Sequence, residues 1–355
     1  MRNDHAPAAP ESRIAIVIVN YKGTTDTIEC LESLLKLEKL RGPAEVHIFV
    51  VENASPDDSY DRLREWLQSA NALNQSANGE LVATFDHAAP FVQVTLLRAS
   101  ENKGFAAGCN IGLTCAFRDP SITHFWLLNN DTIADRKAAA ELLACSESSG
   151  DQCICGSTLL YFHDQDLVQA AAGARYIPLI GRSTHIFKRR RLSEIQNLTP
   201  PKFDYIVGAS MLFSRNVLRI VGPLPERYFL YVEENDWCTR ARSLGVSLQW
   251  SRKSYIYHKE GRSTGTEAGF QKLSNDTFYF VARNNLLYVW KYFRRYTPST
   301  LLYTLVEALL LSLRGDGAKM KTALRAITDF WSERKYQEKP RTEFADSMVV
   351  KTPNQ

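Results

Sequence analysis

The sequence has no long, uninterrupted hydrophobic run. Its most apolar stretch, residues 301–313, contains Glu307 and is too short to span a bilayer. The first residues, MRNDHAPAAPES, lack the apolar segment of a signal peptide or membrane anchor, so we expect residues 1–12 to form a disordered tail. The chain also contains no internal repeat and no low-complexity tract. These absences argue against a membrane-spanning protein and against a repeat architecture.

A strong charge of one sign is missing as well. The chain carries 43 basic and 39 acidic side chains, which gives a net charge of +4 and a pI near 8.6. This excess is too small to indicate nucleic-acid binding. We therefore expect no nucleic-acid partner.

The seven cysteines include no CxxC spacing and lie in apolar surroundings. Their number is odd, which favours reduced thiols in a cytoplasm. The close pair Cys153 and Cys155, together with His163, offers three candidate zinc ligands, whereas a structural zinc site uses four in two close pairs. We expect reduced cysteines and keep the zinc site as a weaker alternative.

Apolar segments alternate with helix-like segments in the first part of the chain. β-branched, buried-looking runs predict strands, and a 3.6-residue apolar period or a small-residue run predicts helices. The predicted strands span residues 13–21, 45–53, 92–100 and 123–131, and the predicted helices span residues 24–37 and 101–117. This alternation predicts βαβ units and an α/β fold with a mostly parallel sheet.

Each of these predicted strands ends in polar side chains. They are Asn20, Glu52 with Asn53, Asn102, and Asn129 to Asp131. Any one of them is compatible with a turn or a helix cap. Ligands of open α/β sheets bind at the carboxyl ends of the strands, so four polar ends in succession favour a ligand site there.

The second half of the chain is less regular. Residues 161–201 mix glycine, polar residues and the basic run Lys188 to Arg191, which suggests excursions across a surface. A helix is expected to begin near the acids of YVEENDW and to end at Gly245, followed by strand-like segments at 246–251 and 254–258.

After Ser274 the pattern is helical. Basic residues accompany the apolar stretches of this region: Lys291, Arg294, Arg295, Lys319, Lys321 and Arg325. Two interpretations follow, amphipathic helices that close the core and helices that lie on an anionic membrane surface.

The ordered segments NYKGTTDT, VVENAS, SENKGFAAGCNIG and LLNNDT resemble the nucleotide-sugar-binding half of inverting family-two glycosyltransferases with the GT-A fold. GASMLF, VGPLPERYFLYVEENDWCTRAR and YHKEGRST resemble the acceptor half, most closely in the rhamnosyltransferase-like branch. The resemblance covers about residues 13–264. It implies a Rossmann-like, mostly parallel central sheet flanked by helices, with a helical C-terminal region. The implied parts are a tail (1–12), a nucleotide-sugar-binding half (13–135), an acceptor-binding half of the same domain (136–272), the C-terminal helical region (273–340) and a second tail (341–355).

By this resemblance the donor is a nucleoside diphosphate sugar, dTDP- or UDP-linked, and rhamnose is the sugar suggested by the branch. Glu52 stands where many relatives carry Asp. The expected donor-binding residues are Asn20, Tyr21, Glu52, Asn53, Asn102, Lys103, Gly104, Gly108, Asn110, Asn129 and Asn130. The two glycines are expected to let the backbone approach the ligand.

The departing diphosphate develops negative charge, which a divalent cation held by carboxylate neutralises. Asp131 is the candidate ligand, because Asn129 replaces the first acid of the family's Asp-x-Asp motif. The resemblance adds His258 as a ligand of the metal or the diphosphate, with Arg262 and Ser263 nearby. The expected cofactor is Mg²⁺ or Mn²⁺, and the competing interpretation of Asp131 is a turn or cap residue.

The acceptor hydroxyl needs one general base. Glu233, Glu234 and Asp236 stand at a predicted helix start, where the helix dipole favours ionised carboxylates. The family match puts Glu234 at the position of the base, with Asp236 as the second candidate. Glu233 as the base, or no base at all, is the remaining alternative, and a solvated acidic helix start is the competing structural interpretation. Glu233 and Asp236 are otherwise expected to organise the acceptor or the helix.

These features together predict an inverting glycosyltransferase that acts on a glycan or lipid-linked acceptor in cell-surface polysaccharide assembly. We expect it in the cytoplasm, with peripheral binding to the inner face of the membrane as an open point. One alternative is a non-catalytic sugar-nucleotide-binding protein, because of Asn129. A glycoside hydrolase that uses Asp131 and Glu234 as its carboxylate pair is a weaker alternative. A nucleotidyltransferase is disfavoured, because no basic glycine-rich loop follows the first predicted strand.

Overall fold

The computed structural model describes residues 13–38, 45–69, 72–76, 79–85, 92–259 and 274–335. The predicted tails, along with Arg262 and Ser263, lie outside the described residues. The strands are β1 (Arg13–Asn20), β2 (Val46–Glu52), β3 (Ala72–Gln75), β4 (Leu81–Phe85), β5 (Val92–Arg98), β6 (Ile122–Leu128), β7 (Thr132–Ala134), β8 (Cys153–Tyr161), β9 (Asp164–Ala170), β10 (Ala174–Ile177), β11 (Arg182–His185), β12 (Ser210–Ser214) and β13 (Ser247–His258). The helices are α1 (Thr24–Leu34), α2 (Ser59–Leu67), α3 (Phe105–Phe117), α4 (Ala138–Ser148), α5 (Leu192–Ile195), α6 (Arg215–Val221), α7 (Glu233–Ser243), α8 (Asn275–Tyr292), α9 (Thr297–Leu313) and α10 (Ala318–Glu333), with short 3-10 turns η1 (Glu226–Tyr228) and η4 (Arg294–Tyr296).

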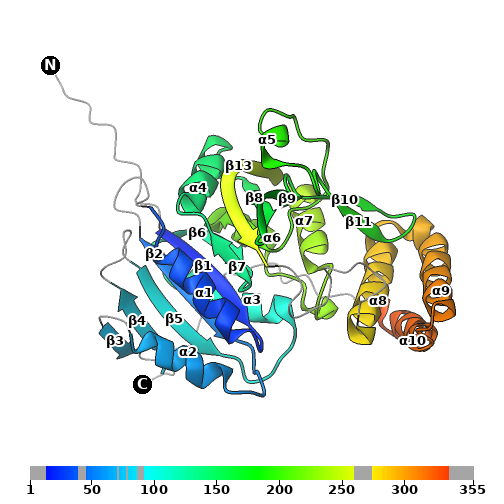
Figure 1. The fold of residues 1–355 in the computed structure, drawn as a ribbon, viewed down its shortest axis with the longest axis horizontal. Helices are drawn as coiled ribbons and strands as arrows, with labels where there is room; N and C mark the ends of the chain where they lie inside the picture. Colours follow the sequence, from blue (N-terminus) through cyan, green and yellow to red (C-terminus); the bar gives the residue numbers. More distant parts are fainter. Residues whose placement is uncertain are drawn as a thin grey trace, which may run out of the picture.

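Four parallel strands, in the order β5, β2, β1 and β6, form the centre of one large sheet (Figure 1). Beyond β6, strand β12 runs antiparallel to both β6 and β8, and β8 runs parallel to β13. Strands β3 and β4 extend the opposite edge in antiparallel pairing. Strands from both predicted halves therefore belong to the same sheet, and the carboxyl ends of β1, β2, β5 and β6 share one edge.

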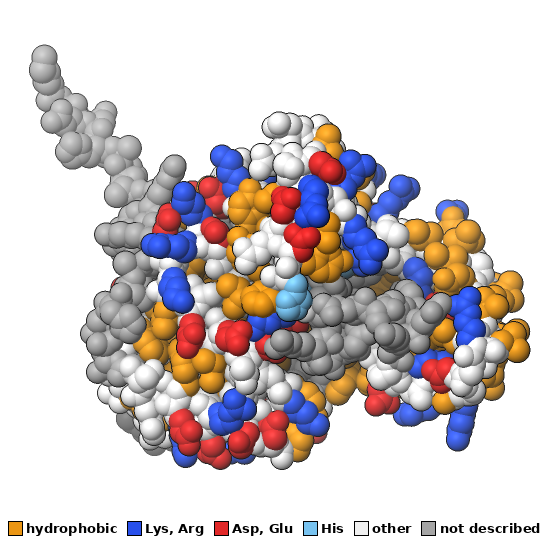
Figure 2. Space-filling model, viewed as in Figure 1, with side chains coloured by type: hydrophobic (Ala, Val, Ile, Leu, Met, Phe, Trp, Pro, Cys, Tyr) orange, Lys and Arg blue, Asp and Glu red, His pale blue; other side chains and the backbone are white. Residues whose placement is uncertain are grey.

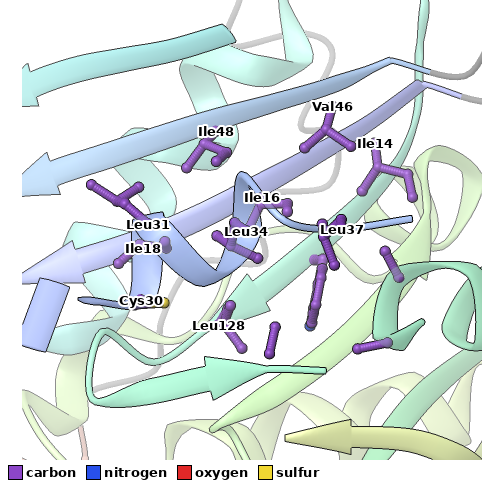
Figure 3. Close-up of a cluster of buried hydrophobic side chains, with 14 of the residues drawn as sticks. Ile14, Ile16, Ile18, Cys30, Leu31, Leu34, Leu37, Val46, Ile48 and Leu128 are labelled. Atoms are coloured by element: carbon purple, nitrogen blue, oxygen red, sulfur yellow. The ribbon is translucent and has the colours of Figure 1, made fainter. Parts of the chain in front are cut away.

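Strand β1 is buried on both faces, as its continuous apolar sequence predicts. Its even-numbered side chains pack against α1 and the neighbouring strands (Figure 3), and the cluster on that face includes Ile14, Ile16, Ile18, Leu31, Leu34, Val46 and Ile48. Its odd-numbered side chains pack on the other face with α3. The sheet is thus covered by helices on both sides, which fixes the position of its carboxyl edge.

The expected α/β fold with a parallel sheet centre and a helical C-terminal region is confirmed. The predicted segments at 246–251 and 254–258 form the single strand β13. The surface excursion expected at 161–201 contains β9, β10, β11 and α5. All seven cysteines are described, and none forms a disulfide. The zinc alternative finds no support, because Cys153 and Cys155 are fully buried while His163 is exposed.

Helices α8, α9 and α10 lie together at one end of the molecule, beyond the β10–β11 hairpin (Figure 1). Helix α8 begins at a cap in which Ser274 Oγ accepts a hydrogen bond of 3.1 Å from the Thr277 backbone. Within the described ranges, none of the helices combines the length and the apolar character that a membrane crossing requires.

One close backbone contact joins the two halves of the domain. Gly104 precedes α3 with φ +96°, and a Cβ built on it would lie 2.1 Å from the carbonyl oxygen of Phe229. The same carbonyl accepts a 2.7 Å hydrogen bond from the Phe105 backbone. Only glycine combines this backbone conformation with so close an approach.

We predict that Gly104→Ala destabilises the protein by about 2–5 kcal/mol, from a strained φ and from a clash with backbone that has little room to move. Gly150 is the matched control, because it has φ +70° but no atom within 4 Å of the position that a Cβ would take. Gly150→Ala should therefore lower the free energy of unfolding by only about 1–2 kcal/mol, the cost of a positive φ for alanine. Urea unfolding followed by circular dichroism measures the stability of both variants. Equal losses of stability would show that the contact between Gly104 and Phe229 does not restrict position 104.

Candidate active site

The ends of the parallel strands meet through their own hydrogen bonds. The backbone N–H of Asn53 donates to the Asn20 carbonyl at 2.9 Å, which continues the β1–β2 ladder. The Asn53 amide nitrogen donates to Asn102 Oδ1 at 3.1 Å and to the Gly104 carbonyl at 3.2 Å. The structure thus brings Asn20, Asn53 and Asn102 to one place, as the sequence predicts.

Asn130, in the loop after β6, reaches the same edge from the other side of β1. Its amide nitrogen donates to Thr27 Oγ1 at 3.0 Å, and that hydroxyl donates to Asn20 Oδ1 at 2.8 Å. A Cβ on Gly23 would lie 2.6 Å from the Asn130 nitrogen, so a larger residue there would displace this amide. Gly23 is absent from the predicted site residues, although its position two residues after the polar pair that ends the first predicted strand is a usable signal.

Several predicted donor residues have protein partners in the structure. Gly108 faces β1, and a Cβ built on it would lie 2.8 Å from a methyl carbon of Val19. The absent side chain of Gly108 therefore makes room for the packing of α3 on the sheet. Asn110 uses its amide on the Leu224 backbone and on Glu226, which ties α3 to the loop before η1. Both residues thus have contacts within the protein, and a donor contact by Gly108 or Asn110 stays a prediction.

Three further residues of the predicted set differ in accessibility. Glu52 is buried, and its Oε1 accepts a 2.8 Å hydrogen bond from the Ser55 backbone. Lys103 is exposed and pairs with Glu101 at 2.7 Å. Tyr21 is exposed directly after β1 and offers a ring face for stacking. A donor contact by any of these three stays a prediction.

Asp131 and His258 lie side by side. The antiparallel pairing of β7 with β13 sets His258 opposite Thr132, and its Nε2 lies 3.1 Å from Asp131 Oδ1. On its other side, Nδ1–H donates to Oε1 of the buried Gln169 at 2.8 Å. With Nδ1 so engaged, Nε2 is the nitrogen that can release its proton and turn a lone pair to a cation.

This pair fits a divalent cation. Two neighbouring ligands of an octahedral ion with bonds of about 2.1 Å lie about 3.0 Å apart, close to the separation found here. In the described part of the chain, no group of three or more His, Cys, Asp or Glu side chains is placed to hold a metal. Mg²⁺ and Mn²⁺ accept few protein ligands when diphosphate and water complete the shell. Burial opposes ionisation of Asp131, but the hydrogen bond and charge of His258 outweigh it and lower the pKa of this carboxyl.

Glu233 and Glu234 occupy the first turn of α7. Burial raises the pKa of Glu234 to about 7. Burial, followed by the charge of Glu234, raises the pKa of Glu233 well above its ordinary value. A carboxylate whose pKa is near neutrality suits a general base, so Glu234 is the better of the two.

Asp236, the second candidate for the base, has a structural role. It is fully buried and accepts hydrogen bonds from Tyr228 Oη (2.6 Å), Tyr292 Oη (2.8 Å) and Lys291 Nζ (2.8 Å). Both carboxylate oxygens are therefore occupied by protein donors, which favours Glu234 over Asp236 as the base, and the choice of base stays a prediction. Local sequence carries no signal for the structural role of Asp236, because Lys291 and Tyr292 lie in α8, more than 50 residues away.

A short chain of contacts links the loop that carries Asp131 to Glu234. The Asn129 backbone donates to the Ala209 carbonyl at 3.0 Å, where β6 ends beside the start of β12. The adjacent Gly208 packs against Glu234, whose Cβ lies 3.7 Å from a Cβ built on the glycine. Both carboxylates therefore lie near the same end of the β6–β12 pair.

Five buried polar atoms near this edge have no hydrogen-bond partner among the described residues, and the same holds for other atoms elsewhere in the protein. Such atoms are rare in folded proteins and call for a ligand, an ion or water. The five are Asn20 Nδ2, Asn53 Oδ1, Asn129 Oδ1, Glu233 Oε2 and Glu234 Oε2. All five belong to residues that the sequence placed at the donor position or among the candidate catalytic acids.

The loop before α7 is strained and is held by the C-terminal region. Phe229, Tyr231 and Val232 all have positive φ values, of 64°, 69° and 78°. The fully buried amide nitrogen of Asn284 in α8 lies 2.7 Å from the Tyr228 and Leu230 carbonyls and 3.1 Å from the Tyr231 carbonyl. Strained backbone persists only where the surroundings impose it, so Asn284 positions the loop that presents Glu234.

We predict that Asn284→Asp lowers the free energy of unfolding by about 1–3 kcal/mol or more, because a carboxylate oxygen would face carbonyl oxygens in place of a donor. The exposed Asn197, changed to Asp, is the matched control and should have little effect. Chemical denaturation checks both variants. A stable Asn284→Asp protein would show that the loop holds its conformation without this amide.

The structure is that of an α/β protein with a parallel sheet centre, in which polar strand ends, a carboxylate–imidazole pair and a glutamate lie near one edge. Comparisons with known proteins give its family. The profile of glycosyl transferase family 2 matches residues 15–221. The chain belongs to this family.

Individual relatives are distant. The low-salt glycan biosynthesis hexosyltransferase Agl10 of Haloferax volcanii is 23% identical over 274 residues, which is 77% of this chain and 76% of that protein. The mannosyltransferase PcManGT of Pyrobaculum calidifontis, solved with GDP-Man and Mn²⁺, is 13% identical, with a TM-score of 0.51 over 96% of this chain and 81% of that chain. GalNAc-T7, solved with UDP, GalNAc and Mn²⁺, is 13% identical, with a TM-score of 0.54 over 91% of this chain and 57% of that chain. These likenesses confirm the predicted GT-A fold.

Proposed function

We propose that the protein is an inverting glycosyltransferase that moves a sugar from a nucleoside diphosphate to a hydroxyl of a glycan or lipid-linked acceptor. The observation that carries the proposal is the placement of the Asp131–His258 pair and of Glu234 near one end of the β6–β12 pair. Family membership and the hexosyltransferase from Haloferax volcanii support the same class of reaction.

Asp131 and His258 would hold a Mg²⁺ or Mn²⁺ ion, whose charge stabilises the departing diphosphate. The Mn²⁺ in the two solved relatives supports a divalent ion in this fold. Gln169 fixes the orientation of the His258 ring, and the β7–β13 pairing fixes its distance from Asp131. The donor's nucleoside would lie along Asn20, Tyr21 and Asn53, where Tyr21 offers a face for stacking.

Glu234 takes the proton of the acceptor hydroxyl as its oxygen attacks the anomeric carbon from the face opposite the diphosphate. Because the pKa of Glu234 lies near 7, the side chain is largely ionised at slightly alkaline pH and still basic enough to accept a proton. Burial, followed by the Glu234 charge, raises the pKa of Glu233 well above its ordinary value, and we assign the base to Glu234.

The finer assignments rest on resemblance. We propose a hexose donor that is dTDP- or UDP-linked, with rhamnose as the first sugar to test, and a role in cell-surface polysaccharide assembly. The Haloferax relative, a glycan biosynthesis enzyme by name, supports that setting. We further propose a cytoplasmic enzyme that meets its acceptor on the inner face of the membrane.

We predict that kcat/KM for transfer rises about tenfold per pH unit below pH 7 and levels off above it, because only the ionised Glu234 accepts the proton. Glu234→Gln should lower kcat by about 10²- to 10⁴-fold and keep donor binding. Glu233→Gln is the matched control and should retain far more activity. A pH profile of sugar transfer, with donor binding measured by calorimetry, checks the assignment.

A stability readout tests the same residue without activity. The folded-state pKa of Glu234 is raised above its ordinary value of 4.5, so ionisation destabilises the fold as the pH rises through 7. Glu234→Gln should therefore be more stable than the parent protein at pH 8, and the gain should vanish near pH 4.5. Full transfer activity of Glu234→Gln would show that Glu234 is not the general base. Absence of transfer from any nucleotide sugar, with donor binding intact, would favour the non-catalytic binding protein.

The metal site is tested by Mn²⁺ affinity in the presence of UDP. We predict that Asp131→Asn and Gln169→Leu each weaken Mn²⁺ binding by about 10- to 100-fold, the first by removing a ligand and the second by freeing the His258 ring. Asp135→Asn, a nearby acid whose Oδ1 accepts from the Lys137 backbone, is the control. Mn²⁺ titration followed by electron paramagnetic resonance measures all three, and unchanged affinity in Asp131→Asn would exclude this pair as the site.

A further inference from the structure

Helix α9 turns most of its large apolar side chains to solvent, whereas a helix that closes a core turns them inward. Its buried face carries three threonines and only two apolar side chains: Thr297, Thr300, Thr304, Ala308 and Leu311. Its exposed large apolar side chains are Leu302, Val306, Leu309, Leu310 and Leu313, of which Leu302 is 64% and Leu313 76% exposed. An apolar face of this size turned to solvent marks a contact surface.

The exposed side chains of α9 form one stripe, which we call the leucine face (Leu302, Val306, Leu309, Leu310 and Leu313). At 100° per residue, the five positions fall within an arc of about 100° around the helix axis. The only charged residue of α9, Glu307, lies outside this arc and forms an ion pair with Arg182. The leucine face therefore has the width of a helix stripe that is buried in an apolar phase.

Exposed basic side chains flank α9 in the chain and lie on α10, which packs against α9. Arg294 and Arg295 are exposed before the start of α9, Arg314 after its end, and Lys321 and Arg325 on α10. Helix α10 adds the exposed Leu324 and Trp331. Figure 2 shows hydrophobic side chains gathered with Lys and Arg at the end of the molecule where Figure 1 places α9 and α10.

The acids of this region form ion pairs, while several of the bases do not, although Arg294 and Arg295 contact the rings of Trp290 and Tyr296. Besides Glu307, the acids Asp316, Asp329 and Glu333 contact Lys319, Arg325 and Arg283. Within the described part of the chain, Arg294, Arg295, Arg314 and Lys321 have no acidic partner closer than 4 Å. Residues 294–335 hold eight basic and four acidic side chains, which leaves 35 of each sign in the rest of the chain. The net charge of +4 is thus carried by the segment that bears the leucine face.

We propose that the leucine face docks on an anionic lipid bilayer, with α9 lying in the plane of the interface. An apolar stripe flanked by Arg and Lys and accompanied by an exposed Trp is the pattern of an interfacial helix. A second copy of the chain fits less well, because a two-fold contact through the leucine face would bring like charges together. This inference goes beyond the proposed function and does not depend on catalysis.

The docking surface is rigidly connected to the candidate active site. Helix α9 packs on α8, and α8 holds the loop before α7 through Asn284 and holds Asp236 through Lys291. Binding of α9 to a bilayer therefore sets the height and orientation of Glu234 relative to the lipid surface. Such an arrangement suits an acceptor whose sugar is attached to a lipid.

The test is flotation of the purified full-length protein with vesicles of phosphatidylcholine alone or mixed with phosphatidylglycerol, at low and high salt. We expect binding to the mixed vesicles at low salt, weak binding to the neutral ones, and release at high salt. Leu309→Gln/Leu313→Gln should weaken partitioning by about tenfold or more, and Arg314→Gln/Lys321→Gln by about 30-fold.

Two matched double variants are the controls. Leu198→Gln/Leu244→Gln changes exposed leucines elsewhere on the surface, and Lys188→Gln/Arg190→Gln changes the other exposed basic cluster. Both should bind as the parent protein does, and circular dichroism melting verifies that all four variants fold.

Three outcomes would overturn the proposal. They are no flotation with the mixed vesicles, equal losses in the control variants, and a dimer by light scattering that Leu309→Gln/Leu313→Gln dissociates. The last outcome would assign the leucine face to self-association.

Discussion

The antiparallel pairing of β12 with β6 is the constraint on which the candidate site depends. It sets the Ala209 carbonyl against the Asn129 backbone, and so places the loop that carries Asp131 beside Gly208, against which Glu234 packs. The parallel strands alone would supply only a nucleotide-binding edge. Because β12, and α7 beyond it, are added to the same edge, the Asp131–His258 pair and Glu234 lie near one end of the sheet, which is the arrangement that the proposed transfer reaction requires.

Backbone strain is concentrated where the two halves and the C-terminal region meet. Phe229 contacts Gly104 on one side, and the carbonyls of the same loop face Asn284 on the other. Asp236 is bonded to Lys291 of α8 as well. The C-terminal helices are therefore a structural part of the candidate site, and their outermost member, α9, is the element that faces away from it with an apolar surface.

Sequence reasoning identified the features that depend on local pattern. The β-branched runs of β1, β2, β5 and β6 predict strands, and the polar residues that follow them meet in space because parallel strands end at one edge. Local pattern did not reveal Asn284 or the buried role of Asp236, because their partners are distant in sequence. It also missed β3, whose side chains are all exposed and carry no burial signal. The apolar period of α9 left two interpretations open, since a period does not say which face of a helix meets the core.

The most direct measurement is a crystal structure of the protein with Mn²⁺ and a non-transferable analogue of its nucleotide sugar. We expect the ion within about 2.3 Å of Asp131 and His258 and bound to the diphosphate, with the Glu234 carboxylate facing the anomeric carbon from the opposite side. An ion held elsewhere, or a Glu234 that is separated from the sugar by protein, would contradict the shared site.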